Sequence, residues 1–329
     1  MRCGTAPPVI TSPVSTMRLR RAARRLMMIL EQARAKVLQS HLADYTTCTL
    51  CDRPGTLAAA AESGQAPCNV RCFKDELFTF WRCTGCGSLH CVENVDLSHY
   101  YRHYPIKSQK LNFHERIGYR NRLRLIERLG FLCSQRILDY GCGPGLFVEF
   151  LRTLGVQNAF GYDPFEPAYS NQRALAESYD VVVSYDVIEH DDDPRQFMRS
   201  LSRLVRPGGM LVIGTPNADH VSLARTRNPV LHPPYHRHIL SKRMLLALGR
   251  EQNLAAQHIY RRSYFDSLIP TVNSRFIWRY IEKADGLLDS AFEPPRQGLI
   301  LRSPDLLFFA FFGYFVPRGD NIIVSFRKA

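Results

Sequence analysis

Residues 137–147 read Ile-Leu-Asp-Tyr-Gly-Cys-Gly-Pro-Gly-Leu-Phe, and this stretch decides the fold. The pattern predicts an apolar strand that ends near Asp139, a loop with glycines at positions 141, 143 and 145, and then a helix. Glycines at this spacing let a backbone pass close to a ligand, where a Cβ atom would collide with it. The stretch therefore predicts a strand, a ligand-binding loop and a helix in succession.

A second short strand is expected after that helix, because residues 160–164 read Phe-Gly-Tyr-Asp-Pro. An acidic side chain at the end of such a strand can bind both ribose hydroxyls of a nucleoside. The dinucleotide pattern G-x-G-x-x-G would need a third glycine at position 146, which is Leu146. Instead, Asp139 precedes the first glycine by two residues, and a carboxylate there suits an ammonium group better than a pyrophosphate. The two segments predict a nucleoside cofactor that is not a dinucleotide.

Two further motifs follow: residues 179–190 read Tyr-Asp-Val-Val-Val-Ser-Tyr-Asp-Val-Ile-Glu-His, and residues 204–213 read Leu-Val-Arg-Pro-Gly-Gly-Met-Leu-Val-Ile. With the glycine loop and the Asp163 strand, they stand in the order found in class I S-adenosylmethionine-dependent methyltransferases, and residues 115–329 resemble that family. The resemblance implies a doubly wound, Rossmann-like α/β sheet that binds S-adenosylmethionine. The expected cofactor-binding residues are Asp139, Gly141, Cys142, Gly143, Gly145, Asp163, Pro164 and Asp186, with Cys142 contributing its backbone.

Methyl transfer is an in-line displacement, so the protein mainly positions the nucleophile and excludes water. A hydroxyl or carbon nucleophile also needs a base, and histidine is the usual one near neutral pH. The candidate catalytic residues are His190, which ends the 179–190 motif, and His236 and His238, which precede a predicted helix. The alternative is a structural histidine at a strand end and two surface histidines in a proline-rich loop.

Helical spacing of apolar residues predicts helices over 115–129 and 146–154, and further helices after Asp193-Pro194 and after Ser241. A terminal strand over 321–326 is expected to close the sheet. Between Asp163 and Asp180 the chain is too short for a crossover helix and a strand, since a crossover alone takes a dozen or more residues. The third strand of the family is therefore expected to be abbreviated or missing. Phe165 or the backbone near Ser184 is expected to border the adenine instead.

Two Cys-x-x-Cys pairs, Cys48/Cys51 and Cys83/Cys86, stand among ten cysteines. Paired cysteines in a chain without an export signal more often hold a metal than form disulfides. Four thiolates satisfy tetrahedral Zn²⁺ and leave no open position, so a structural zinc site in a zinc-ribbon-like module is predicted. Cys68 and Cys72 are alternative ligands, and an iron–sulfur cluster or reduced cysteines without a metal are the alternative interpretations.

The expected organisation is a basic N-terminal extension over 1–40, partly disordered or helical, a zinc-binding module over 41–97, an aromatic connector over 98–114 and the methyltransferase domain over 115–329. Within the connector, Tyr100, Tyr101 and Tyr104 are candidates for a lid over the cofactor or for packing between domains. Knuckles of this kind before a methyltransferase domain are similar to those of bacterial sugar and natural-product C-methyltransferases.

The predicted function is cytoplasmic methyl transfer from S-adenosylmethionine to oxygen or carbon of a small molecule, such as a sugar, a lipid-linked compound or a natural-product intermediate. The longest apolar run, residues 306–316, is shorter than the ~20 residues of a membrane span, and predicts core or a lid over an apolar substrate. A net charge of +13 keeps a nucleic-acid or protein methyltransferase as one alternative, although nucleic acid is not the expected partner. A non-catalytic zinc-bearing interaction protein is the other. The oligomeric state is left open.

Overall fold

The computed structural model describes residues 46–105, 110–224 and 228–329, so the predicted extension over 1–40 lies outside the described residues. The chain divides into two compact units. The described part of the smaller unit holds the two-residue strands β1 (Thr46–Thr47) and β2 (Pro54–Gly55), which pair antiparallel, and one short 3₁₀ turn (Leu57–Ala59). The larger unit comprises Cys48–Arg53 and Ala60–Ala329, and it contains every predicted site residue.

A six-stranded sheet forms the centre of the larger unit. Its spatial order is β11 (Leu254–Tyr260), β12 (Asn321–Lys328), β9 (Val205–Pro216), β8 (Tyr179–Tyr185), β6 (Ile137–Tyr140) and β7 (Ala159–Tyr162). The last four of these are mutually parallel, whereas β12 runs antiparallel to both β9 and β11. The terminal strand is present as predicted, but it does not close the sheet. It lies inside it, and β11, whose sequence gave no clear strand signal, forms the edge.

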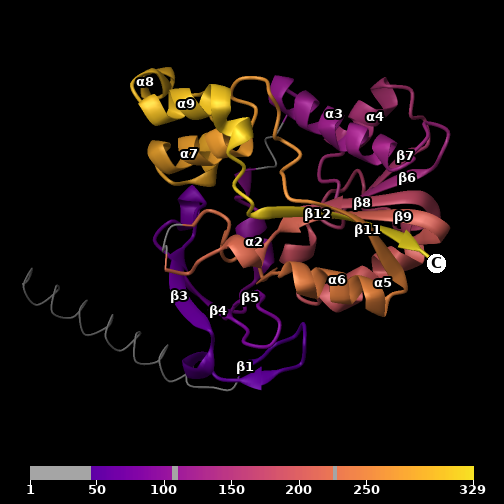
Figure 1. The fold of residues 1–329 in the computed structure, drawn as a ribbon, viewed down its shortest axis with the longest axis horizontal. Coiled ribbons are helices and arrows are strands. Elements are labelled where there is room, and N and C mark those ends of the chain that lie inside the picture. Colours follow the sequence, from indigo (N-terminus) through magenta and orange to yellow (C-terminus); the bar gives the residue numbers. More distant parts are fainter. Residues whose placement is uncertain (1–45, 106–109, 225–227) are drawn as a thin grey trace, which may run out of the picture. The chain divides into compact units, whose positions relative to one another are not determined.

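Helices cover both faces of this sheet (Figure 1): α3 (Phe113–Arg128) and α4 (Leu146–Thr153) lie on one face, α5 (Pro194–Leu204) and α6 (Lys242–Glu251) on the other. Val181 and Val183 pack into the core of α3 and α4, whereas Val182, which is also buried, points to the opposite face. A strand that is buried on both sides is typical of a parallel sheet between two helical layers. The doubly wound α/β fold is confirmed.

The predicted helix boundaries follow from local capping. The Asp193 carboxylate accepts a hydrogen bond from the Gln196 amide at 2.9 Å, and the Ser241 hydroxyl accepts one from the Met244 amide at 3.1 Å. Each side chain satisfies an amide that the first helical turn leaves free. At the other end of α3, Gly130 adopts φ +98°, a left-handed conformation that stops a helix at little cost.

Residues 163–178, all of which the structure describes, form no strand and only one 3₁₀ turn, Gln172–Leu175. The expectation of a missing third strand is confirmed, and β7 is consequently an edge of the sheet. The chain leaves β6 for β7 on one side and later enters β8 on the other. Ligands of open α/β sheets bind at such a switch point, outside the carboxyl ends of the strands.

The cysteine-containing segment forms a second, antiparallel sheet in the order β10 (His238–Ile239), β5 (Leu89–Cys91), β4 (Leu77–Arg82) and β3 (Glu62–Pro67). Strand β10 comes from far along the chain and pairs His238 with His90. The core of this sheet accordingly mixes Phe78 and Phe80 with Leu231 and Tyr235. The boundaries 41–97, 98–114 and 115–329 stay a prediction, but the small sheet is completed by a segment of the third region.

A helical layer formed by α7 (Ser274–Ala284), α8 (Gln297–Leu301) and α9 (Pro304–Phe312) contains the long apolar run (Figure 1). Leu306 and Ala310 are buried in its core, whereas Phe308 and Phe311 are 50% and 58% exposed. The run is therefore only partly core. Among the residues that the structure describes, no helix combines the length and the apolar character that a membrane crossing requires.

Candidate functional site

The glycine loop between β6 and α4 has the geometry of a ligand cradle. Gly141, Gly143 and Gly145 all adopt positive φ, at 80°, 51° and 79°. A Cβ atom on Gly141 would come within 2.3 Å of Val187, and one on Gly145 within 2.2 Å of the Tyr169 ring. At Gly143 a Cβ atom would meet nothing within 4 Å, so this is the glycine that faces open space. Gly141 and Gly145 are required because a side chain there would clash with Val187 or Tyr169. Gly143 instead borders open space beside the loop.

Asp163 stands directly after β7 and is fixed by two backbone amides. Its Oδ2 accepts a hydrogen bond from the Gly143 amide at 3.0 Å, and its Oδ1 accepts one from the Phe165 amide at 2.8 Å. The carboxylate is half-buried and retains free lone pairs on both oxygens. It is thus held against the open side of the glycine loop, while its neighbour Pro164 is exposed.

Cys142 lies inside the same loop with its side chain turned into the core of α3 and α4. Its thiol contacts the Gly143 carbonyl oxygen at 3.5 Å, and burial raises its pKa. Since only a thiolate is a reactive nucleophile, this environment favours the predicted backbone role over a redox role.

Asp139, on β6, is buried with 4% of its surface exposed. Burial raises the pKa of its carboxyl group to about 6, and the Arg122 guanidinium partly offsets that rise. Arg122 extends from α3 toward the same edge of the sheet. Its guanidinium lies 3.7 Å from the centre of the Tyr264 ring and 4.3 Å from that of Tyr185. The edge therefore carries a buried cation as well as a buried acid.

Asp186 follows β8 in a left-handed conformation, φ +57°. Its Oδ2 accepts a hydrogen bond from the Tyr264 hydroxyl at 2.8 Å and lies 3.9 Å from the Arg122 guanidinium. Because β7, β6 and β8 are parallel neighbours, Asp163, Asp139 and Asp186 come together at one edge of the sheet. The sequence pointed to all three carboxylates, but it gave no function to Arg122 or Tyr264.

Glu189, His190 and His236 form a second group, here named the Glu-His cluster, in which one side-chain ligand atom from each lies within 4.8 Å of the others. Glu189 and His190 belong to the 3₁₀ turn Ile188–His190 after β8. The His236 Nε2 atom lies 4.0 Å from the Glu189 Oε1 atom. The predicted catalytic residues His190 and His236 are thus neighbours, and Glu189, part of the same motif, joins them.

A hydrogen-bonding partner orients the side chain of each member of the Glu-His cluster. The Glu189 Oε2 accepts a hydrogen bond from the Thr215 hydroxyl at 2.9 Å. The His236 Nδ1 lies 2.8 Å from the Val230 carbonyl oxygen, so this nitrogen carries the proton and Nε2 keeps a lone pair. The His190 Nδ1 lies 2.9 Å from the Tyr101 hydroxyl.

Burial shifts the pKa values of all three members of the Glu-His cluster. Burial raises the pKa of Glu189 well above its ordinary value, and the nearby Asp186 acts in the same direction. Burial also lowers the pKa of His236 to about 4 and, together with His236, holds the pKa of His190 well below its ordinary value. Both imidazoles are therefore neutral at pH 7 and can accept a proton or bind an ion.

His238, the third predicted catalytic histidine, is placed elsewhere. Its Nδ1 lies 2.9 Å from the His90 Nδ1, and its Nε2 lies 3.2 Å from the Asp192 carbonyl oxygen. Another histidine, His232, packs beside His236 with a ring-centre distance of 5.0 Å. Both of its nitrogens are engaged, one by Asn69 and the other by the Tyr104 hydroxyl.

The aromatic connector reaches both parts of the site through Tyr101, the last residue of α2 (Leu97–Tyr101). The Tyr101 ring stacks on the exposed Phe165 ring at 5.2 Å between centres, while its hydroxyl contacts His190. The Tyr100 hydroxyl instead donates to Glu76 at 2.6 Å, toward the cysteine-containing sheet. Of the three predicted lid residues, Tyr101 is the one that contacts both the Asp163 loop and the Glu-His cluster.

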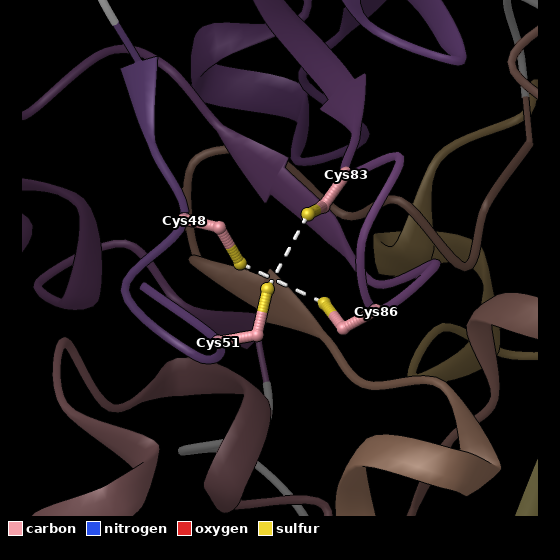
Figure 2. A group of neighbouring side chains, drawn as sticks. All are labelled: Cys48, Cys51, Cys83 and Cys86. Atoms are coloured by element: carbon pink, nitrogen blue, oxygen red, sulfur yellow. Dashed lines mark hydrogen bonds between the residues drawn. The ribbon is translucent and has the colours of Figure 1, made fainter. Parts of the chain in front are cut away.

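The four cysteines of the two Cys-x-x-Cys pairs converge, and we name Cys48, Cys51, Cys83 and Cys86 the cysteine cluster (Figure 2). The Cys48 and Cys86 sulfurs are 3.6 Å apart, as are those of Cys51 and Cys83. A tetrahedral zinc ion with Zn–S bonds of ~2.3 Å holds its sulfurs about 3.8 Å apart. The donor set and the spacing both fit such an ion.

The two alternative cysteine ligands are not part of the cysteine cluster in the part of the chain that the structure describes. Cys68 is buried, with burial raising its pKa to about 12, and Cys72 is exposed. A histidine does approach the cysteine cluster, because the His90 Nε2 lies 3.2 Å from the Cys48 sulfur. Through the His90 contact with His238, the cysteine cluster is connected to the backbone of the loop that follows the Glu-His cluster.

Comparison with known proteins agrees with this geometry. A profile of the methyltransferase domain family matches residues 113–259. The ubiquinone biosynthesis O-methyltransferase of Neisseria meningitidis is 31% identical over 121 residues, which cover 30% of this chain and 51% of that protein. The same-named protein of Yersinia pestis is 28% identical over 123 residues, covering 30% of this chain and 51% of its own length. The chain thus spans about half the length of the curated relatives it matches.

Among solved structures, a S-adenosylmethionine-dependent methyltransferase from Mesorhizobium loti aligns with a TM-score of 0.40 and 15% identity, covering 63% of this chain and 98% of the other. A likeness of that size carries no argument about function. The profile match and the curated relatives give the class: residues 113–259 match the methyltransferase domain family, and the sheet has the Rossmann-like topology of class I S-adenosylmethionine-dependent methyltransferases.

Proposed function

We propose that the protein transfers a methyl group from S-adenosylmethionine to a hydroxyl oxygen of a small-molecule acceptor. The observation that carries this proposal is the arrangement at the carboxyl edge of the sheet. Three carboxylates follow or end three neighbouring parallel strands there, and the first member of the Glu-His cluster, Glu189, lies three residues beyond the third carboxylate, Asp186. The three carboxylates suit a cofactor, and the Glu-His cluster suits a nucleophile.

The cofactor-binding role is assigned to the loop residues and two charged groups. The Asp163 carboxylate binds the ribose hydroxyls beside the open face of Gly143. The methionine part of the cofactor carries an ammonium and a carboxylate group, and the buried pair Asp139 and Arg122 offers one opposite charge to each. Tyr101 and Phe165 border the adenine in place of a residue on the missing third strand.

The acceptor role is assigned to the Glu-His cluster. In the transfer, the acceptor O–H bond gives up its proton and an oxygen lone pair forms the new bond to the methyl carbon. The S–CH₃ bond breaks, its electron pair stays on sulfur, and neutral S-adenosylhomocysteine leaves. His190 and His236 are neutral and lie side by side, with a ring-centre distance of 4.8 Å, and the free Nε2 of His236 accepts the proton that the hydroxyl loses. His238 is not included in this proposal, because both of its nitrogens are engaged by other groups.

The choice of oxygen and of a small acceptor rests on the relatives. The proteins from Neisseria meningitidis and Yersinia pestis are named as ubiquinone biosynthesis O-methyltransferases. Their names describe their own reactions, and they support an O-methyl transfer to a small molecule here.

We further propose that the cysteine cluster binds one structural zinc ion. Four thiolates at tetrahedral spacing close the coordination sphere, so the ion stabilises the small sheet and takes no part in the chemistry. The amide of Gly85 donates to the Cys83 sulfur at 3.3 Å and helps to orient this ligand.

Two measurements on the full chain test the proposed activity. Calorimetric titration should give saturable binding of S-adenosylhomocysteine, and a radiolabelled methyl group should appear on phenols or other hydroxyl compounds from an acceptor panel. Binding of S-adenosylhomocysteine without transfer to any hydroxyl acceptor would overturn the acceptor assignment. Absence of binding would overturn the proposed function as a whole.

A further inference from the structure

We infer that Arg237 and His238 are positioning residues for the acceptor side of the site: they hold the turn that carries Glu189 and His190 to the small sheet formed by β10, β5, β4 and β3. Zinc in the cysteine cluster stabilises that sheet, so its presence also fixes the geometry of the Glu-His cluster. This inference rests on the proposed function, which places zinc at one end of these contacts and the acceptor at the other. His238 contributes through its contacts and takes no proton.

The first contact joins the cysteine cluster to β5, the strand that follows Cys86. His90 lies at the middle of β5 and is 3% exposed. Its Nε2 lies 3.2 Å from the Cys48 sulfur, and its ring stacks on the Trp81 ring of β4 with 4.7 Å between centres. The chain after Cys86 and the contact with Cys48 thus connect β5 to two of the four cysteines.

The second contact joins β5 to β10. In this antiparallel pair His238 stands opposite His90, and their Nδ1 atoms are 2.9 Å apart. The Cys91 amide also donates a hydrogen bond to the Arg237 carbonyl oxygen at 2.9 Å. Strand β10 is only two residues long, so its pairing with β5 determines where Arg237 and His238 lie.

The third contact joins the same two residues to the turn after β8. The Arg237 amide donates to the Glu189 carbonyl oxygen at 2.8 Å, so the Arg237 backbone accepts from β5 and donates to the turn. The His238 Nε2 lies 3.2 Å from the Asp192 carbonyl oxygen. Each residue therefore contacts the small sheet on one side and the turn on the other.

The Arg237 side chain connects the same segments a second time. It is buried, with 8% of the residue exposed, and its Nε donates to the Asp192 Oδ1 at 3.0 Å. Its other nitrogens donate to the Glu93 carbonyl oxygen and, at 3.4 Å, to the Asn94 Oδ1, in the segment that follows β5. A guanidinium group presents its donors in a rigid fork. Arg237 therefore fixes the turn relative to the end of β5.

These contacts reach the acceptor side of the site. Arg237 directly follows His236, whose Nε2 lies 4.0 Å from the Glu189 Oε1, so they set the distance between the turn and the loop that form the Glu-His cluster. On the cofactor side, Asp163 is held instead by two backbone amides of the loops at its own edge of the large sheet. Loss of the small sheet should therefore disturb the acceptor side and spare the cofactor side.

Hydrogen exchange of the full chain, followed by mass spectrometry, tests this inference without relying on activity. The ion supplies much of the folding free energy of the small sheet, and contiguous contacts carry its loss to the turn. Removal of zinc by a chelator should therefore speed exchange in the small sheet and also in residues 187–193. Residues 141–149, in the glycine loop and α4, should stay within about twofold.

Two variants interrupt the contacts while the four cysteines stay in place. Arg237→Gln and His238→Asn should each keep the zinc ion and the protection of the small sheet, but speed exchange in residues 187–193 by about fivefold, the effect of one lost hydrogen bond. Arg243→Ala is the matched control, because this exposed arginine donates to the Gly85 carbonyl oxygen beside the cysteine cluster, and its exchange should equal that of the wild type. With a hydroxyl acceptor from the panel, the two variants should lower kcat by about tenfold and leave KM for S-adenosylmethionine within about twofold.

A cooperative thermal transition is the control for folding, and His238→Asn replaces Arg237→Gln if the latter fails it. Unchanged exchange in residues 187–193, in the zinc-free chain or in a folded variant, would overturn this inference and leave the proposed function standing. Equal acceleration in residues 141–149 would overturn it as well, because the small sheet would then support the whole fold. The expected exchange pattern in a chain that does not bind S-adenosylhomocysteine would support the positioning contacts and overturn the proposed function.

Discussion

The cysteine cluster and the Glu-His cluster are both groups of potential metal ligands, but they differ in composition and access. The cysteine cluster has four identical ligands at tetrahedral spacing, drawn from two short knuckles of the sequence. The Glu-His cluster has three mixed side chains, drawn from a turn after β8 and from a loop 46 residues further on. A closed site can only stabilise, whereas an open one can also act on a substrate. The comparison therefore predicts a structural role for the cysteine cluster and a chemical role for the Glu-His cluster.

The largest effect is expected from removing two ligands of the closed site. Changing both Cys83 and Cys86 to Ser should abolish zinc binding and unfold the β3–β5 sheet. The metal supplies much of the folding free energy of so small a core, about 10 kcal/mol or more in isolated zinc modules. Zinc content and thermal unfolding measure this loss, and Cys72→Ser, at an exposed cysteine, is the matched control. Unchanged stability in the double variant would remove the cysteine cluster from its structural role.

A loss of activity without a loss of stability is expected at the open site. Glu189→Gln should lower methyl turnover by about 10²-fold or more, because it removes the carboxylate beside His236, one of the two histidines that activate the acceptor. Its affinity for S-adenosylhomocysteine should stay within about twofold, since the cofactor residues are untouched. Steady-state kinetics measures the turnover, and calorimetry measures the affinity for S-adenosylhomocysteine. An equal loss of affinity and turnover would contradict the division between cofactor and acceptor regions.

Asp163→Ala should weaken binding of S-adenosylhomocysteine by ~1–3 kcal/mol, through the lost hydrogen bonds to the ribose. The variant also leaves the Gly143 amide without its acceptor. Calorimetric titration measures the change, with Glu177→Ala, at an exposed carboxylate, as the control. Unchanged affinity would remove Asp163 from the site.

The smallest expected effect is a pH dependence of cofactor affinity. The pKa of Asp139 is raised to about 6 by burial, and the bound ammonium group needs the carboxylate form. Affinity should therefore be full above about pH 7 and fall by up to tenfold per pH unit below about pH 6. Titrations between pH 5 and 8 should show this slope in the wild type and lose it in Asp139→Asn.

The raised pKa of Asp139 has the opposite pH dependence in its effect on the folding stability of the ligand-free protein. A carboxyl whose pKa rises from 3.8 to about 6 on folding binds more protons in the folded state between those values. Its contribution to stability is therefore lost as the pH rises from about 4 to 6. The contribution of Asp139 is the stability of the wild type minus that of Asp139→Asn at each pH. A difference that rises between pH 4 and 6 would contradict the assignment of the shift to Asp139.

The sequence predicted that Asp139, Asp163 and Asp186 lie at one edge of the sheet, because that information is local; their binding of the cofactor stays a prediction. Each of the three carboxylates lies at or just after the end of an apolar strand, and parallel strands bring their ends to one edge. The Cys-x-x-Cys spacing was likewise sufficient to predict the convergence of four thiols. The missing third strand could also be predicted, since it depends only on chain length.

The contacts that the sequence did not reveal are long-range. Arg122 stood on a predicted amphipathic helix as one of several arginines, and only packing shows that it lies beside Tyr185 and Tyr264. The pairing of β10 with β5 and the contact of Tyr101 with His190 join residues far apart in the chain. Strand β11 was missed because most of its residues are exposed and it lacks an apolar alternation.

The central claim is that the carboxyl edge of β7, β6 and β8 binds S-adenosylmethionine. A crystal structure of the full chain with S-adenosylhomocysteine tests it most directly. The ribose should hydrogen-bond to Asp163, and the sulfur should face Asp186 and the Glu-His cluster. A ligand bound elsewhere, or a nicotinamide nucleotide that takes this edge in preference to it, would contradict the account.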